Sequence, residues 1–280
     1  MKTLSLSTGE QIPILGFGTW RLGGTRHPDY SEDQSITDHL KQAIQLGFTH
    51  IDTAEMYAGG HTEELVGEAI RDFDRSSLII GTKVWQSNLR YSDVINALHQ
   101  SLQRLKTDYV DIYSIHLPSP HIPMSETFKA LNELVTQGKI RHIGLSNFNV
   151  HLATIAQQLS DTPIVMIQSP ASLYNQKFIK SGLLQHCQDN KLILAAYSPF
   201  ERGEIFGNPH LEEIAHKYGA SPAQIALRWL LQTPQTMVYL MSLNPAHLQQ
   251  NIDALDLEIA NEDLKSLDHI QMPEDKLFPI

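Results

Sequence analysis

Short apolar runs of strand length alternate along the chain with stretches that have the apolar spacing of an amphipathic helix. Runs rich in β-branched and other apolar residues are typical of strands that are buried on both faces. Eight such runs occur, at residues 15–18, 48–52, 78–82, 109–115, 140–146, 164–168, 192–197 and 237–240. Before them, residues 3–6 and 11–14 flank the turn sequence Ser-Thr-Gly-Glu and predict a small β-hairpin.

Helical stretches lie between these runs. Apolar side chains repeat at three- and four-residue spacing, for example at Ile36, Leu40, Ala43 and Ile44, and again at Val94, Leu98, Leu102 and Leu105. Helix starts are expected at Thr62, Ser125, Asn208-Pro209 and Ser221-Pro222, with Gln224 completing a capping box. Helix ends are expected at Gly47, Gly138 and Gly219.

Single helices between strands imply parallel pairing with right-handed crossovers, and eight repeats predict a closed (β/α)8 barrel preceded by the N-terminal β-hairpin. No linker divides the chain, so residues 1–280 are predicted to form a single domain. The alternative is an open, doubly wound dinucleotide-binding sheet. It requires a glycine-rich turn after the first strand, but Gly16-Phe17-Gly18-Thr19-Trp20-Arg21 lacks the third glycine and no helix pattern begins there.

Composition excludes several classes of protein. The 31 acidic and 21 basic side chains give a net charge of −10, which disfavours binding to nucleic acid. The single cysteine, Cys187, permits no intramolecular disulfide, and we expect an inert buried thiol. The start of the chain has no apolar signal segment, no run is long enough to span a membrane, and the 14 histidines show no metal-binding spacing. We therefore expect a cytoplasmic protein without a metal, a membrane or a nucleic acid as partner.

Polar side chains follow the predicted strands at the end where barrel enzymes hold their active sites. They are Asp52, Lys83, His116, Ser146, Asn147, Gln168, Tyr197 and Ser198, with Tyr57 in the loop after Asp52. Each residue alone has an ordinary structural explanation, such as a turn cap or a hydrogen-bonded core side chain. Four ionisable groups at one barrel mouth instead indicate a functional site, because charge at the end of a buried strand is costly unless it is paired or used.

The residue types at this mouth suggest proton transfer. A tyrosine has a pKa of about 10, and a neighbouring lysine cation is expected to lower it. Asp52 would hold Lys83 in place, and His116 would orient a carbonyl oxygen by a hydrogen bond. Such a site can protonate an oxygen atom while hydride arrives from elsewhere. Since no side chain donates hydride, a nicotinamide cofactor is implied.

Several motifs together give a resemblance to the aldo-keto reductases, from about residue 14 to residue 267. They are Leu15-Gly16-Phe17-Gly18-Thr19-Trp20, Ile51-Asp52-Thr53-Ala54-Glu55-Met56-Tyr57, Thr82-Lys83-Val84-Trp85, Asp111-Ile112-Tyr113 leading to His116-Leu117-Pro118, and Gly138-Lys139-Ile140-Arg141 leading to Gly144-Leu145-Ser146-Asn147-Phe148. The resemblance implies an NAD(P)H-dependent reductase of aldehydes and ketones.

The resemblance also implies roles for individual residues. Tyr57 would be the proton donor, Lys83 and Asp52 the pair that tunes it, and His116 the group that orients the carbonyl. Cofactor contacts would come from Thr19, Trp20, Asp52, Ser146, Asn147, Gln168, Tyr197, Ser198, Pro199, Ser242, His247, Gln250 and Asn251. The substrate pocket would include Trp20, Trp85 and Leu117.

The chain departs from the family pattern at two places. Ile167 replaces an asparagine that usually precedes the glutamine at the end of the sixth strand. After the eighth strand, Leu240-Met241-Ser242 replaces Pro-Lys-Ser, and His247 takes the place of an arginine that contacts the 2′-phosphate of NADPH. Methionine carries no charge and histidine is mostly neutral at pH 7. NADPH is the cofactor expected from the family, and we expect NADH to compete better than usual.

Two other functions stay open at the level of sequence. One is a nucleotide-sensing regulatory protein on the same fold, like the potassium-channel β subunits, although all four catalytic positions are filled. The other is a lyase or isomerase that uses Lys83 as a Schiff base. After the last predicted helix only residues 271–280 remain, and we expect so short a tail to leave an open pocket and broad specificity for small carbonyl substrates. The sequence leaves a monomer and a weak homo-oligomer equally open.

Overall fold

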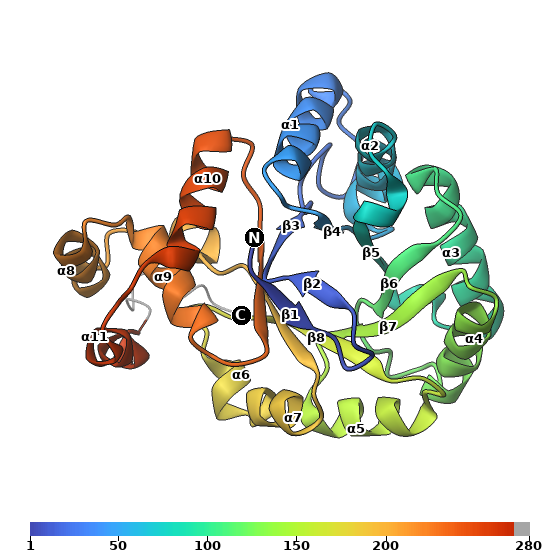
Figure 1. The fold of residues 1–280 in the computed structure, drawn as a ribbon. Helices are drawn as coiled ribbons and strands as arrows, with labels where there is room; N and C mark the ends of the chain where they lie inside the picture. Colours follow the sequence, from blue (N-terminus) through green and yellow to red (C-terminus); the bar gives the residue numbers. More distant parts are fainter. Residues whose placement is uncertain (272–280) are drawn as a thin grey trace.

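Eight parallel strands close into a barrel in the computed structural model, which describes residues 1–271 (Figure 1). Around the barrel the order is β10-β3-β4-β5-β6-β7-β8-β9, and β10 pairs with both β9 and β3 to close it. The strands are β3 Leu15–Gly18, β4 His50–Asp52, β5 Ile79–Val84, β6 Val110–Ile115, β7 Ile140–Ser146, β8 Ile164–Pro170, β9 Ile193–Tyr197 and β10 Thr236–Leu240. The predicted barrel is confirmed, with each strand shifted from its predicted bounds by at most two residues.

Helices surround the barrel (Figure 1). Their apolar faces pack on the outer surface of the strands, where side chains from the two layers form one large buried core. The helices are α1 Asp33–Gln45, α2 His61–Ile70, α3 Tyr91–Leu105, α4 Met124–Thr136, α5 Val150–Leu159, α6 Lys177–Lys180, α7 Leu183–Asp189, α8 Pro209–Tyr218, α9 Pro222–Leu231, α10 Pro245–Asp253 and α11 Asn261–Ser266. Cys187 is fully buried in this core, and burial raises the pKa of its thiol to about 12.

A hairpin covers one end of the barrel. Strands β1 (Thr3–Ser5) and β2 (Gln11–Pro13) pair antiparallel, as predicted, and lie across the barrel in Figure 1. Leu6 and Ile12 are buried against inward-facing side chains such as Ile112. Because all barrel strands run in the same direction, the hairpin closes their N-terminal end and leaves their C-terminal end to form the mouth.

Two of the predicted helix starts are confirmed in detail. The side chain of Asn208 accepts hydrogen bonds from two backbone N–H groups of α8. Ser221 and Gln224 form the reciprocal capping box at the start of α9. The predicted ends are also confirmed, since Gly47, Gly138 and Gly219 each follow a helix with a positive φ.

The other two predicted starts are wrong. Helix α2 begins one residue before Thr62, after Gly60 in the left-handed region, and the Thr62 hydroxyl donates to the carbonyl of Leu22 instead. Helix α4 begins at Met124, so Ser125 lies inside its first turn. Both side chains have cap chemistry, but the cap positions are occupied by Gly60 and Pro123, and neither helix has a side-chain cap hydrogen bond. The expectation about the C-terminal tail concerns residues 272–280, which lie outside the described residues.

Candidate active site

A buried lysine joins the side chains at the barrel mouth. Lys83 lies in β5 and is only 2% exposed. Its Nζ donates hydrogen bonds to Oδ2 of Asp52 at 2.5 Å, to the carbonyl of Thr53 at 2.8 Å and to the hydroxyl oxygen of Tyr57 at 3.2 Å. An ammonium group has three protons, so these three acceptors satisfy it completely. The structure therefore brings together three of the four ionisable residues that the sequence predicts.

An irregular turn places Tyr57. The chain leaves β4 and forms the 3-10 turn η1 (Tyr57–Gly60), where Ala58 has φ +49° and the two following glycines also have positive φ. The N–H of Ala58 donates to the carbonyl of Thr25, which fixes the turn to the loop after β3. Glycine reaches these angles without strain, so Gly59-Gly60 lets the chain reverse within one turn. The reversal holds the Tyr57 ring over the mouth, where the residue is 9% exposed.

Four rings form a continuous row at the mouth, which we call the aromatic row: Trp20, Tyr57, His116 and Trp85. The centroid of the Tyr57 ring lies 4.8 Å from that of Trp20 and 5.6 Å from that of His116. The ring of Trp85 meets His116 edge-on, with centroids 5.1 Å apart. These residues come from the ends of four neighbouring strands, β3 to β6. The row therefore brings His116, the fourth ionisable residue, next to Tyr57.

Burial and the lysine charge act in opposite directions on Tyr57. Burial raises the pKa of its hydroxyl above the usual value of 10, while Lys83 lowers that pKa less strongly. Lys83 thus acts in the predicted direction, but the expectation of a lowered pKa is wrong because burial outweighs its effect. Tyr57 consequently keeps its proton at neutral pH. Burial lowers the pKa of Lys83, but Asp52 and Tyr57 together outweigh it, so the pKa is raised and the ammonium stays charged.

His116 is electrically neutral at physiological pH. Burial, and to a lesser extent the charge of Lys83, lowers the pKa of its imidazole to about 3. Its Nδ1 atom is buried and has no hydrogen-bond partner among residues 1–271. A neutral imidazole carries one N–H donor and one acceptor nitrogen. Beside Tyr57, this ring can donate a hydrogen bond to an oxygen atom without adding a charge.

Gln168 supports Asp52 from inside the barrel. It lies in β8 and is 2% exposed, and its amide nitrogen donates to Oδ1 of Asp52 at 2.7 Å. Both carboxylate oxygens of Asp52 are therefore bonded, one to Gln168 and one to Lys83. The preceding residue, Ile167, packs on the helix-facing side of the strand because neighbouring side chains in a strand point to opposite faces.

Asn147 connects three strand ends. The residue has φ +62°, its Nδ2 donates to the carbonyl of His116 at 3.0 Å, and its Oδ1 accepts the hydroxyl proton of Tyr197 at 2.7 Å. The Nδ2 also donates to the hydroxyl oxygen of Ser146 at 2.9 Å. The bond from Tyr197 fixes the orientation of its ring. These groups are neutral hydroxyls and amides beside a fixed aromatic ring, which suits a planar heterocycle with a carboxamide and so fits a nicotinamide.

The remaining predicted cofactor residues lie in different environments. Thr19 is fully buried, and its hydroxyl donates to the backbone carbonyl of Asp52. Pro199 and Asn251 are buried, and Leu117 and Ser242 are half-buried, whereas Ser198, His247 and Gln250 are exposed. Met241 is 48% exposed at the end of β10. The structure therefore places an uncharged, solvent-accessible side chain at this position.

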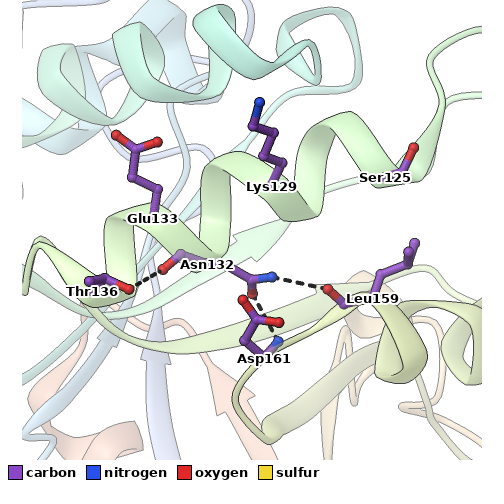
Figure 2. A pocket seen from close by; sticks show the side chains of 7 residues that line it. All are labelled: Ser125, Lys129, Asn132, Glu133, Thr136, Leu159 and Asp161. Carbon is purple, nitrogen blue, oxygen red and sulfur yellow. Dashed lines mark hydrogen bonds between the residues drawn. The ribbon is translucent and has the colours of Figure 1, made fainter.

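A separate polar groove lies on the outside of the barrel between α4 and α5 (Figure 2). Asn132 joins the two helices there, since its Nδ2 donates to the carbonyl of Leu159 and its Oδ1 accepts from the N–H of Asp161. Lys129 and Glu133 project from the same face of α4 (Figure 2). None of the predicted site residues lines this groove, and its hydrogen bonds serve to hold α4 against the end of α5.

Sequence reasoning missed two residues that contact the site. Glu55 accepts hydrogen bonds from the backbone of Trp85 and from the side chain of Asn88. Tyr239, on β10, is buried inside the barrel beside Gln168, with its hydroxyl 3.4 Å from the amide nitrogen. Glu55 lies within a motif quoted for the resemblance, but its partners are some 30 residues away, so only the folded chain shows its role.

A closed (β/α)8 barrel with a buried, charged hydrogen-bond network at its C-terminal mouth has the architecture of a barrel enzyme. The model of the Aldo/keto reductase family matches residues 14–272. Methylglyoxal reductase YeaE from Escherichia coli (strain K12) is 34% identical over 272 residues, which cover 95% of this chain and 94% of the relative. The chain belongs to the aldo-keto reductase family and is an oxidoreductase.

Solved structures agree with this assignment. The thermostable aldo-keto reductase Tm1743, in complex with the inhibitor epalrestat, is 46% identical with a TM-score of 0.94, and the match covers 96% of this chain and 99% of that one. An aldo-keto reductase from Klebsiella pneumoniae in complex with NADPH is 31% identical with a TM-score of 0.89, covering 98% and 96% of the two chains. The predicted family is therefore confirmed.

Proposed function

We propose that this protein reduces aldehydes and ketones to alcohols with NAD(P)H, and that Tyr57 donates the proton. The observation that carries the proposal is the bond between Nζ of Lys83 and the hydroxyl oxygen of Tyr57, at 3.2 Å, beside the neutral ring of His116. A donor must hold its proton before the reaction and must tolerate its loss afterwards. Burial meets the first requirement and the lysine cation meets the second.

A nicotinamide dinucleotide, when bound, would supply the hydride to the carbonyl carbon. In this proposal Ser146, Asn147 and Gln168 hold its carboxamide, and the Tyr197 ring, fixed by Asn147, supports one face of the heterocycle. Hydrogen bonds and stacking of this kind set both the rotation and the face of a ring, which is how an enzyme brings reacting atoms together.

The chain's own residues then handle the carbonyl oxygen. His116 donates a hydrogen bond that orients this oxygen toward the Tyr57 hydroxyl. Tyr57 transfers its proton to the oxygen, and the resulting phenolate lies next to the Lys83 ammonium. Asp52 keeps Lys83 in position and balances its charge. Because these groups are already oriented and largely shielded from water, their electrostatic effect is greater than it would be in solution.

Replacement of Tyr57 by phenylalanine tests the proposal. The variant loses the proton donor and keeps the ring, so turnover of 4-nitrobenzaldehyde should fall by about two orders of magnitude or more. Dissociation constants for NADPH and NADH should remain close to those of the wild type. If the wild-type protein binds the cofactor but reduces no carbonyl in a broad panel, the nucleotide-sensing alternative replaces this proposal.

The Schiff-base alternative conflicts with the environment of Lys83. A nucleophilic amine must be deprotonated, whereas this ammonium has three acceptors and a raised pKa. Treatment with borohydride in the presence of substrate should therefore leave Lys83 unmodified. A covalent adduct on Lys83 would instead support a lyase or isomerase that forms a Schiff base with this residue.

We also propose that NADH competes with NADPH better than is usual in the family. Met241 is exposed at the position that usually holds a lysine, and His247 is exposed at the position of the usual arginine. Hydrogen bonds to charged groups contribute roughly 1.5–3 kcal/mol each, so the loss of two is sufficient to remove a strong preference. Michaelis constants for both cofactors test the idea, and an NADPH preference of about a hundredfold or more would contradict it.

The substrates are proposed to be small carbonyl compounds. One relative is named a methylglyoxal reductase, which is consistent with aldehydes and dicarbonyls as substrates here. Trp20 and Trp85, at the two ends of the aromatic row, are proposed to line the pocket, with Leu117 beside them. A screen of small aldehydes, dicarbonyls and aromatic aldehydes should show activity across several members, and strict preference for a single compound would contradict broad specificity.

A further inference from the structure

The carboxylate of Glu55 connects the loop that carries Tyr57 to the turn that carries Trp85. Its Oε1 accepts a hydrogen bond from the backbone N–H of Trp85 at 2.6 Å and another from Nδ2 of Asn88 at 3.0 Å. Its own backbone N–H donates to the carbonyl of Lys83 at 3.3 Å. Glu55 therefore bonds to both the end of β5 and the turn that follows it, η3 (Gln86–Asn88).

These hydrogen bonds form where β5 extends beyond the end of the neighbouring strand β4. Strand β4 ends at Asp52, which pairs with Gly81, whereas β5 continues to Val84. After Asp52 the chain still donates to β5 from the N–H groups of Thr53 and Glu55, but among residues 1–271 no backbone carbonyl is bonded to the N–H of Trp85, the residue after β5. A half-buried N–H group without a partner is costly. The side chain of Glu55 supplies the acceptor that the shorter strand lacks.

The Trp85 ring depends on this turn for its direction. It meets the His116 ring edge-on at 5.1 Å, with an angle of 85° between the planes, and His116 in turn meets Tyr57. The backbone nitrogen of Trp85 is hydrogen-bonded to Glu55, and it is separated by only two covalent bonds from the Cβ atom that carries the indole. Fixing this N–H therefore limits the positions the indole can take at the end of the aromatic row.

We propose that Glu55 is a positioning residue that sets the orientation of Trp85 and thereby the affinity for carbonyl substrates with a bulky ring. The inference rests on the proposed function, because that proposal places the substrate pocket at the barrel mouth where Trp85 lies. Glu55 touches neither of the polar atoms proposed to transfer or orient the proton. Its loss is therefore expected to act on KM for large substrates and much less on kcat or on small substrates.

Two substitutions separate the hydrogen bonds of Glu55 from its charge. Glu55→Gln keeps an oxygen that can accept from Trp85 and Asn88, and it should resemble the wild type. Glu55→Ala removes both bonds. In Glu55→Ala, KM for 4-nitrobenzaldehyde should rise by about tenfold, whereas KM for methylglyoxal should change by less than about twofold and kcat for either by less than about threefold. Should Glu55→Ala fail to fold, Glu55→Met serves in its place, since it keeps the side-chain volume and lacks the acceptor.

A measurement without turnover tests the orientation itself. The chain has three tryptophans, so 5-fluorotryptophan labelling gives three fluorine resonances, and Trp85→Phe identifies one of them. In Glu55→Ala the Trp85 resonance should shift or broaden, while that of Trp229, a buried residue of α9 whose indole N–H donates to Asp268, should stay in place. Glu55→Gln should leave all three unchanged.

The outcomes distinguish the inference from the proposed function. An unchanged Trp85 resonance together with an unchanged ratio of the two KM values in Glu55→Ala would overturn the inference. So would a Glu55→Gln variant as impaired as Glu55→Ala, because the charge rather than the hydrogen bonds would then matter. Failure of the wild type to reduce any carbonyl would refute the proposed function alone, and the fluorine spectra would still decide the role of Glu55.

Discussion

Nζ of Lys83 lies 2.5 Å from Oδ2 of Asp52, and both side chains are more than nine-tenths buried. A buried pair of this kind adds little net stability, since removing two ions from water offsets most of their attraction. Removing only one partner is different, because it leaves a charge in a site that cannot solvate it. Replacing one member of the pair should therefore lower both activity and stability, whereas replacing both members should lower activity alone.

Lys83→Met should lower the free energy of unfolding by about 3–5 kcal/mol, because Asp52 is left buried and unpaired. The double variant Asp52→Asn with Lys83→Met removes both charges and should recover stability to within about 1 kcal/mol of the wild type, with carbonyl reduction still absent. Guanidinium denaturation and cofactor oxidation measure the two effects. A Lys83→Met protein as stable as the wild type would show that the site admits water.

His61 should make stability depend on pH. Its two ring nitrogens lie 2.9 Å from carboxylate oxygens of Glu64 and Asp33. Burial lowers its pKa, but hydrogen bonds to these carboxylates outweigh burial, so the pKa is raised above the usual 6.5. A histidine whose pKa is higher in the folded state than in the unfolded state stabilises the folded protein when it is protonated. This contribution is complete at pH values below the unfolded-state pKa, and it is lost as the pH rises through the folded-state pKa.

The comparison of wild type with His61→Gln isolates this effect from other titrating groups. The difference in Tm between the two proteins should be largest below about pH 6.5 and should shrink as the pH is raised above that value. His142, whose pKa is lowered chiefly by burial, is present in both proteins and cancels. A difference that does not vary with pH would mean that His61 contributes through packing alone, for example against Tyr30.

Met241→Lys should shift cofactor preference toward NADPH. The new cation replaces an exposed side chain at the end of β10, so the fold is not expected to change. One charge-assisted bond to the 2′-phosphate corresponds to about a tenfold change in the ratio of kcat/KM for NADPH to that for NADH. Ile179→Lys, at an exposed position on α6, adds the same charge elsewhere and should leave the ratio unchanged. Equal shifts in both variants would indicate a general effect of net charge.

Gly67→Ala should destabilise the protein although it improves helix propensity. Gly67 lies within α2, where alanine is favoured over glycine by about 1 kcal/mol. A Cβ atom at this position would lie 2.4 Å from the backbone carbonyl oxygen of Arg104 in α3. Backbone cannot rotate away, so the two helices would have to separate, and we expect a net loss of about 1–2 kcal/mol in denaturant unfolding. A gain in stability would show that α2 and α3 are free to separate.

Much of the fold could be read from local patterns. The eight apolar runs correspond to the eight barrel strands, and the capping box at Ser221 and Gln224 forms as expected. These features depend on neighbouring residues, so they are visible in a short stretch of sequence. The starts proposed at Thr62 and Ser125 were wrong: the Thr62 hydroxyl bonds to the carbonyl of Leu22, 40 residues away, and α4 begins directly after Pro123.

The sequence predicted which residues gather at the candidate site, but not which atoms bond to one another or how burial changes their pKa values. Strand ends in a parallel barrel meet at one mouth, which is why Asp52, Lys83 and His116 could be grouped with Tyr57 from their positions alone. Their energies depend on burial, and burial is a property of the whole fold. It reversed the expected direction of the Tyr57 pKa shift, because removal of water from the hydroxyl outweighs the nearby cation.

The sequence by itself determined which elements form, the order in which they alternate, and which ionisable side chains reach the mouth, since each follows from periodicity and position along the chain. Tertiary structure decided which atoms touch. Gln168 bonds to Asp52 across 116 residues, and Glu55 to Trp85 across 30. Such contacts depend on where each strand end points and on how far apart the packed elements lie. These distances and directions are set only when the barrel closes.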